Sequence, residues 1–181
     1  MNRIRSAIAA LGRYGQMMLE VGKDIARHGV NVRELAKQVV KIGRDSLPIV
    51  LLTGLFSGMV LALQTAYGLQ RFGAKDYVGN VVSLAMVREL GPVLTALMLC
   101  GRVGAGIAAE IGSMTVTEQV DAIRALGASP IRKLVSPRIV AGLLAVPALV
   151  VFANVIGVWG GGLVAVQELD QAAFRYKSAI L

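Results

Sequence analysis

The chain has 181 residues, of which 55% are hydrophobic and only 17% are charged, with a mean hydropathy of +0.65. Soluble domains carry roughly 25% charged residues, so this composition argues against a water-soluble globule. The net charge is nevertheless +8, so the placement of the basic residues matters. With a single cysteine (Cys100) and a single histidine (His28), the sequence offers little for a disulfide, a zinc site or a Ser-His-Asp triad. We expect no metal site and no catalytic residue.

Residues 1–45 carry nine of the nineteen basic residues and have the pattern of amphipathic helices. Apolar residues recur at helical spacing in the first part, at Ile4, Ile8, Leu11, Met18, Val21 and Ile25. Asn31 and Glu34 form an N-x-x-E signal for the start of a second helix. A basic face opposite an apolar one favours the anionic cytoplasmic surface of a membrane. Packing on a partner protein is the alternative, and nucleic-acid binding is the weaker third interpretation.

Two long stretches without charged residues predict membrane spans. Residues 46–70 and 139–167 contain 25 and 29 residues, and at about 1.5 Å per residue each crosses a hydrocarbon core of about 30 Å. Residues 78–109 are also apolar, with a few ionisable residues inside the pattern, and predict one more long helix. The sequence therefore predicts an all-α membrane protein with spans at about 47–70, 78–109 and 138–166, inside a transmembrane domain of residues 46–181.

The basic residues also predict the orientation of these spans. Four more of them lie between Arg124 and Arg138, so the positive-inside rule places the N-terminus and the loop 110–137 in the cytoplasm. Within this loop, a capping box of Thr115 and Glu118 predicts the start of a short amphipathic helix, which Gly127 ends. Such a helix suits a membrane protein that receives a push from a soluble partner. A turn lying on the lipid surface fits the periodicity equally well.

Arg88 and Glu89 are the sharpest candidate site residues. Ionisable groups in a span are costly when they face lipid, so they usually face a cavity, a partner charge or an interface. Neighbours on an α-helix point about 100° apart, so these two are not expected to neutralise only each other. One interpretation is a polar point in an apolar cavity that contacts a lipid headgroup. The other is that both anchor the helix at the outer membrane interface.

Small residues are dense in the inner half of the second span, which predicts close helix packing. They are Gly101, Gly104, Ala105, Gly106 and Ala109. Residues 104–109 formally match G-x-G-x-x-A, but no strand precedes them, which argues against a dinucleotide site. The sequence has no G-x-x-x-x-G-K-[ST] phosphate-binding loop, so we expect any ATP to be hydrolysed by another chain.

An ordered set of motifs resembles the MlaE (YrbE-type) permease family of lipid-transporting ABC transporters. The motifs are Arg88-Glu89-Leu90-Gly91-Pro92-Val93, Gly101-Arg102, Ala109-Glu110-Ile111-Gly112, Thr117-Glu118-Gln119, Ser136-Pro137-Arg138 and Trp159-Gly160-Gly161. The match covers roughly residues 45–165. Permeases of this family continue through two further spans, so we expect this chain to be the first three spans of a longer permease.

The resemblance implies a function and a set of site residues. It implies a permease in the inner membrane of a Gram-negative-type envelope that moves glycerophospholipid and helps maintain outer-membrane lipid asymmetry. Lipid contacts would come from Arg88, Glu89, Leu61, Leu69, Phe72 and Leu90. ATPase coupling would come from Thr117, Glu118, Gln119, Asp121, Ala122, Ala125 and Leu126. The four leucine and phenylalanine positions are equally typical of ordinary packing.

The resemblance also implies an assembly, with no cofactor in this chain. A homodimer would bind a cytoplasmic MlaF-like ATPase holding ATP and magnesium, a MlaB-like STAS-domain protein and a MlaD-like MCE-domain protein on the periplasmic side. Nucleic acid would not be a partner. Two alternatives are a membrane scaffold without its own transport path and an ion-coupled secondary transporter, although the first and third spans hold no Asp, Glu or His for ion coupling.

Overall fold

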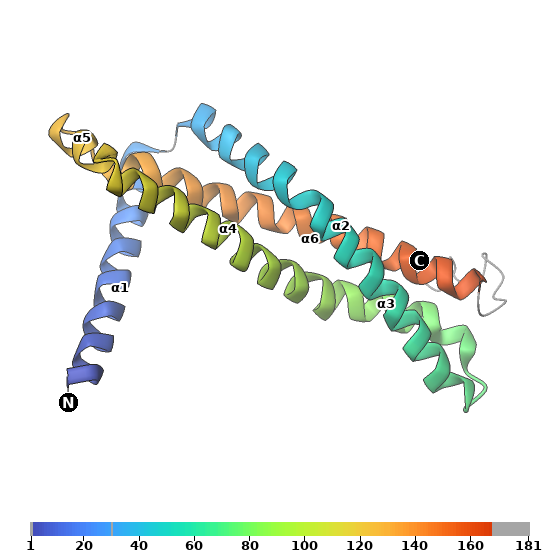
Figure 1. Ribbon diagram of the computed structural model, residues 1–181. Coiled ribbons are helices and arrows are strands. Elements are labelled where there is room, and N and C mark those ends of the chain that lie inside the picture. The colour runs from blue at the N-terminus through green and yellow to red at the C-terminus, as the bar shows by residue number, and fades with distance from the viewer. Residues whose placement is uncertain (1, 30, 168–181) are drawn as a thin grey trace. The chain divides into compact units, whose positions relative to one another are not determined.

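The computed structural model describes residues 2–29 and 31–167, and every regular element within them is helical. The elements in chain order are α1 (Asn2–His28), α2 (Val32–Gln70), the 3-10 turn η1 (Lys75–Tyr77), α3 (Val78–Ala85), the π-helix η2 (Met86–Leu90), α4 (Gly91–Val116), α5 (Gln119–Ala125), the π-helix η3 (Ile131–Val135) and α6 (Ser136–Gln167) (Figure 1). The predicted all-α fold is confirmed. The end of the predicted transmembrane domain, residues 168–181, lies outside the described residues.

Among the described residues, three helical stretches are long and apolar enough to cross a membrane, which confirms the three predicted spans. They are Val32–Gln70, Val78–Val116 and Ile131–Val166, and each is longer than the predicted span. In particular, α2 joins the expected second interfacial helix and the first span in one helix. Pro48 lies inside α2 without ending it, as the packing of neighbouring helices allows in membrane spans.

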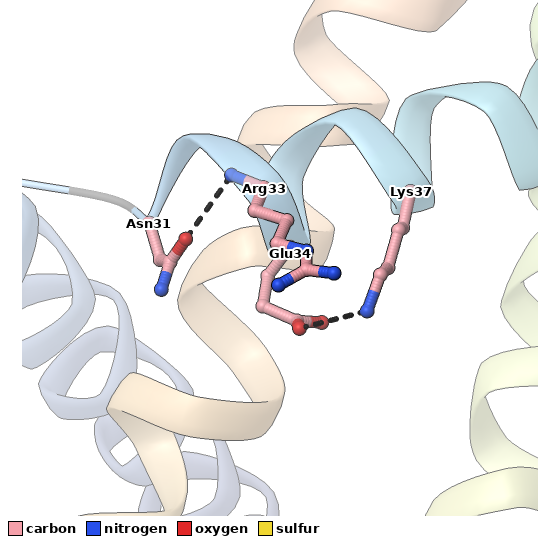
Figure 2. Close-up of polar contacts among 4 residues, drawn as sticks. All are labelled: Asn31, Arg33, Glu34 and Lys37. Carbon is pink, nitrogen blue, oxygen red and sulfur yellow. Dashed lines mark hydrogen bonds and ion pairs between the residues drawn. The ribbon is translucent and has the colours of Figure 1, made fainter.

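Asn31 determines where α2 begins. Its side-chain Oδ1 accepts a hydrogen bond from the backbone N–H of Arg33 at 3.1 Å, which satisfies one of the free donors of the first turn (Figure 2). The carbonyl of Asn31 accepts the first helical bond, from the N–H of Leu35. Glu34 instead pairs with Lys37 at 3.2 Å on the exposed surface (Figure 2). The predicted helix start is therefore confirmed.

The chain folds into two compact units, with residues 1–41 and 107–143 in the first and residues 42–106 and 144–181 in the second. In the first unit, α1 packs against η3, and Val21 on the inner side of α1 is only 3% exposed. Asp24 accepts a hydrogen bond from the Ser136 hydroxyl at 3.1 Å, and its other carboxylate oxygen lies 4.0 Å from Nε of Arg132. Polar contacts thus join α1 to the start of α6.

The second unit has two apolar clusters. One is formed by Ala62, Ala66, Val78, Val82 and Met86, and the other by Val50, Leu99, Leu149 and Ala153. Most of these side chains are small or β-branched, so the helices that carry them pack closely. Between helices in a membrane, van der Waals contact between small residues is a main source of stability, because lipid offers no hydrophobic driving force.

Glycines of α2 and α6 face each other at the closest approach of these helices. A Cβ atom added to Gly58 would overlap the main chain of Gly157, and one added to Gly54 would lie 2.9 Å from the carbonyl oxygen of Ala153. A Cβ on Gly160 would lie 2.7 Å from the carbonyl oxygen of Leu55. Only glycine fits at these positions. The close packing that the sequence placed in residues 101–109 is therefore seen, within this unit, between α2 and α6.

Candidate functional site

Arg88 and Glu89 lie in the π-helix η2, where the backbone widens by one residue. The N–H of Gly91 donates to the carbonyl of Met86, five residues earlier, instead of to the usual partner four residues earlier. Met86 is fully buried, whereas Val87, Arg88 and Glu89 are exposed. The wide turn thus presents the two ionisable side chains together on the outer side of the second unit. Single π turns inside α-helices are frequent at functional sites.

Neither ionisable side chain is neutralised by the rest of the chain. Within residues 2–29 and 31–167, neither Arg88 nor Glu89 forms a hydrogen bond or an ion pair. Both lie in the first third of a helical stretch, Val78–Val116, that is apolar enough to cross a membrane. Charged groups in such a place need a polar partner, which would come from outside the described chain. This makes the pair a candidate site for a polar ligand group.

Three of the predicted lipid-contacting residues pack against the same apolar cluster, and one of them, Leu90, is in η2. Leu61, Leu69 and Leu90 are partly buried against the apolar cluster that contains Met86. Phe72 is 83% exposed in the turn that follows α2. The structure thus brings the three leucines to one cluster and leaves Phe72 outside it.

A small cavity lies on the other side of the π-helix. It is lined by Val50, Thr53, Gly54, Met86, Gly91, Leu94, Thr95, Met98 and Ala153. The Thr53 hydroxyl donates to the carbonyl of Ile49 in its own helix. The space is about large enough for one water molecule. An acyl chain would not fit, so this cavity is not a lipid site in the present arrangement.

The loop predicted to couple to a partner is well ordered but begins differently from the prediction. The capping box of Thr115 and Glu118 was wrong: α4 continues to Val116, and the Thr115 hydroxyl donates to the carbonyl of Ile111 within that helix. Glu118 precedes α5 in the left-handed conformation, with φ 56°, and makes no side-chain cap. The helical hydrogen bonds of α4 extend past the motif, so Thr115 has no free N–H groups to cap.

The C-terminal end of α5 lies at Gly127, as the sequence predicted. Gly127 has φ +73°, a conformation that only glycine adopts without strain. The N–H groups of Ala128 and Gly127 donate to the carbonyls of Ile123 and Arg124, which is the Schellman arrangement. The helix ends where the sequence indicated because a following glycine satisfies its last carbonyls.

All seven predicted coupling residues are exposed on this short segment. They are Thr117, Glu118, Gln119, Asp121, Ala122, Ala125 and Leu126. Leu126 and the adjacent Val116 are 83% and 84% exposed, which is unusual for large apolar side chains, and Asp121 pairs with Arg124 at 3.0 Å. The structure thus places an apolar and charged surface at the tip of the loop.

Glu110 connects three helices below this loop. Its carboxylate lies 2.8 Å from Nη2 of Arg138 in α6 and 3.3 Å from Nζ of Lys41 in α2. The Arg138 side chain is only 6% exposed, whereas that of Glu110 is 35% exposed, so the pair is buried on the Arg138 side and partly solvated on the Glu110 side. In the second unit, Arg102 donates to the carbonyl of Asp45, which joins α4 to α2. Some charged residues of the spans therefore join helices, namely Lys41, Arg102, Glu110 and Arg138, whereas the side chains of Arg88 and Glu89 make no such contact within the described residues.

The small residues of α4 that were predicted to pack against another helix are exposed. Gly101, Gly104, Ala105, Gly106 and Ala109 are all exposed. A Cβ atom on any of the three glycines would meet nothing within 4 Å. Their role in helix packing stays a prediction.

The fold and the site define a class of protein: a helical membrane protein with three spans, an unpaired polar pair within one span and an exposed loop helix. The sequence matches the family described as Permease MlaE over residues 35–180, and the chain belongs to this family. The resemblance seen in the sequence is thereby confirmed.

Curated relatives agree with this membership. The chain is 47% identical over 167 residues to a probable ABC transporter permease protein of Rickettsia bellii, which covers 92% of this chain and 64% of the relative. It is 43% identical over 169 residues to the intermembrane phospholipid transport system permease protein MlaE of Haemophilus influenzae, covering 91% and 64%. It is also 38% identical over 149 residues to the chloroplastic protein TRIGALACTOSYLDIACYLGLYCEROL 1 of Arabidopsis thaliana, covering 82% and 41%. The chain thus spans less than two thirds of the length of these relatives.

Sequence reasoning missed several residues that shape the site. Gly54 and Gly58 drew no attention, although their spacing of four in an apolar run is a packing signal. Asn154 was also overlooked, although it is the only amide inside the third span. The π geometry of residues 86–90 has no established sequence signal.

Proposed function

We propose that this chain is the membrane-spanning permease subunit of an ABC transporter that moves glycerophospholipid between the inner and outer membranes of a Gram-negative-type envelope. The observation that carries the proposal is the exposed, unpaired Arg88–Glu89 pair within an apolar span. The membership of the MlaE family and the printed name of the Haemophilus relative support the same substrate class. Such transport would help maintain the lipid asymmetry of the outer membrane.

Each part of the site has a role in this proposal. The Arg88 guanidinium is suited to the phosphate of a phospholipid, since arginine binds phosphate through two parallel hydrogen bonds. Glu89 is suited to an ammonium group or to a hydroxyl of the headgroup. Leu61, Leu69 and Leu90 would form an apolar wall, and Phe72 would supply a further apolar contact at the end of α2.

The energy for transport would come from a partner. We propose that an MlaF-like ATPase, which holds ATP and magnesium, docks on residues 117–126 and pushes on α4 and η3. The exposed Leu126 and Val116 would supply apolar contact, and Glu118 and Asp121 would supply charge. Through the pairing of Glu110 with Arg138 and Lys41, movement of this loop would reach three helices.

The remaining partners and the location complete the proposal. Two copies of the chain would form a homodimer, with the open face of Gly101, Gly104 and Gly106 as a suitable contact. A MlaB-like STAS-domain protein and a periplasmic MlaD-like protein would belong to the same complex. The protein would lie in the inner membrane with its N-terminus in the cytoplasm, where the basic residues of 1–45 favour anionic lipid.

Lipid contact is tested by photocrosslinking in native membranes. A photoreactive residue at position 69, 72 or 89 should capture phospholipid that mass spectrometry identifies, whereas the same residue at exposed Val155 of α6 is the control for contact with bulk lipid. Arg88→Ala and Glu89→Ala should each reduce lipid transport at least tenfold. Full transport by both variants, with no excess of lipid adducts over position 155, would refute the proposal.

A further inference from the structure

The π-helix that carries Arg88 and Glu89 is held from one side by α6. The methyl carbon of Met86 occupies the place where Gly157 would carry a Cβ, and the side-chain oxygen of Asn154 occupies the corresponding place at Gly91. Asn154 and Gly157 are three residues apart and therefore share a face of α6. Met86 is the first residue of the π turn and Gly91 directly follows the turn. These two residues thus contact positions of α6 that are one helical turn apart.

This double contact requires π geometry. In an α-helix, residues 86 and 91 would point about 140° apart, so both could not face α6. The extra residue in the π turn brings Met86 and Gly91 onto the same side. With Met86 and Gly91 facing α6, the residues that point away from α6 are Val87, Arg88 and Glu89, and all three are exposed in the structure. In an α-helical turn, residue 89 would instead lie within about 60° of Met86 and would turn toward α6.

Asn154 is the polar group at this contact. Its Oδ1 is buried and has no hydrogen-bond partner among the described residues. A buried amide oxygen without a partner is costly, so hydrogen bonding does not account for an amide at this position. A Cβ on Gly91 would overlap the Oδ1 atom and would lie 2.7 Å from the carbonyl oxygen of Met86, which accepts the hydrogen bond that defines the π turn.

We propose that Asn154 is a positioning residue: its amide holds the π turn open and thereby keeps Glu89 exposed beside Arg88 at the lipid-contacting site. This inference rests on the proposed function for the role of the pair, but the geometric part is independent of it. Asn154 does not touch the lipid in this account. It acts through Gly91 and Met86.

The test measures which residues of the turn are accessible. Single cysteines are placed at positions 88 and 89 in a Cys100→Ser background, since Cys100 is itself exposed. They are labelled with a small thiol reagent in native membranes that hold the full-length protein. In the parent protein both positions should react. Asn154→Leu should lower the ratio of labelling at 89 to labelling at 88 at least threefold, because the turn relaxes toward an α-helix.

Two further variants make the ratio decisive. Gly91→Ala should lower it similarly, because the new methyl group would overlap Asn154 Oδ1 and lie 2.7 Å from the carbonyl oxygen of Met86. Val155→Leu, one residue from Asn154 but 65% exposed, should leave the ratio within twofold of the parent. General misfolding would alter the labelling of both cysteines, or would also change the ratio in the Val155→Leu variant. If Asn154→Leu does not accumulate in the membrane, Gly91→Ala decides.

The outcomes separate this inference from the proposed function. An unchanged ratio in Asn154→Leu, or an equal fall in Val155→Leu, would overturn the positioning role even if Arg88→Ala and Glu89→Ala abolish transport. A lowered ratio with unchanged lipid transport would support the positioning role and count against lipid contact by Glu89. A lowered ratio together with at least a threefold loss of lipid adducts at position 89 would support both.

Discussion

Arg138 Nη2 lies 2.8 Å from Glu110 Oε1, and this contact joins the start of α6 to α4. The guanidinium is 6% exposed and its buried Nη1 has no hydrogen-bond partner among the described residues, whereas the carboxylate is 35% exposed and also reaches Lys41. A buried cation that loses its only counter-charge is strongly destabilising, while an exposed pair contributes little. The contact therefore ranks first among the charged pairs of the described chain.

Replacement of Glu110 should test this ranking. Glu110→Ala should destabilise the protein by about 2 kcal/mol, which is less than for a fully buried pair because Glu110 is partly solvated. Thermal unfolding of the purified protein in detergent measures the effect. Glu34→Ala removes the exposed pair with Lys37 and is the matched control, with an expected change below about 0.5 kcal/mol. Equal effects in the two variants would contradict the assignment.

The glycine contact between α2 and α6 predicts that the protein loses stability when one of these glycines is replaced by a larger residue. Gly58→Ala places a methyl group onto the main chain of Gly157, so the helices must separate, at an expected cost of about 2 kcal/mol. Gly68→Ala, in the same helix but with no atom within 4 Å, should cost nothing measurable. Both variants are compared by thermal unfolding and by the amount that accumulates in the membrane. A stable Gly58→Ala protein would disprove the close approach.

Glu118, which precedes α5 in the left-handed conformation, can be substituted so that an effect of the backbone conformation is distinguished from an effect of the side chain. Glu118→Gly should raise stability by about 1 kcal/mol because glycine adopts φ 56° without strain. Glu118→Ala keeps the strain and removes only the carboxylate. If the carboxylate contacts the ATPase, both variants should weaken copurification of the ATPase severalfold. Weakening by Glu118→Gly alone would mean that the backbone conformation, and not the charge, matters.

Loss of the Asn31 cap of α2 should lower stability by less than the Glu110 and Gly58 substitutions do. Asn31→Ala removes the acceptor of the Arg33 N–H and should cost about 1 kcal/mol. Asn31→Ser keeps a capping oxygen and should recover most of this stability in the same thermal assay. If Asn31→Ala and Asn31→Ser unfold at the same temperature, the cap does not contribute.

Much of the fold was predictable because it follows from periodicity and composition. The uncharged runs 46–70 and 139–167 must be helices in a membrane, since a helix satisfies all its backbone groups internally. The starting signal at Asn31 and the ending signal at Gly127 are local, and both were correct. Arg88 and Glu89 stood out because ionisable residues are rare in spans. The boundaries were less well predicted, since α4 continues past Thr115 to Val116.

By itself, the sequence determined the class, the three spans, the exposed loop helix and the membership of the MlaE family. Tertiary structure alone decided which glycines make contact, that Glu110 binds Arg138, and that residues 86–90 form a π turn resting on Asn154 and Gly157. The reason is physical. Spans and caps depend on neighbours along the chain, whereas helix contacts depend on which faces meet, and every apolar face of a span looks alike in sequence.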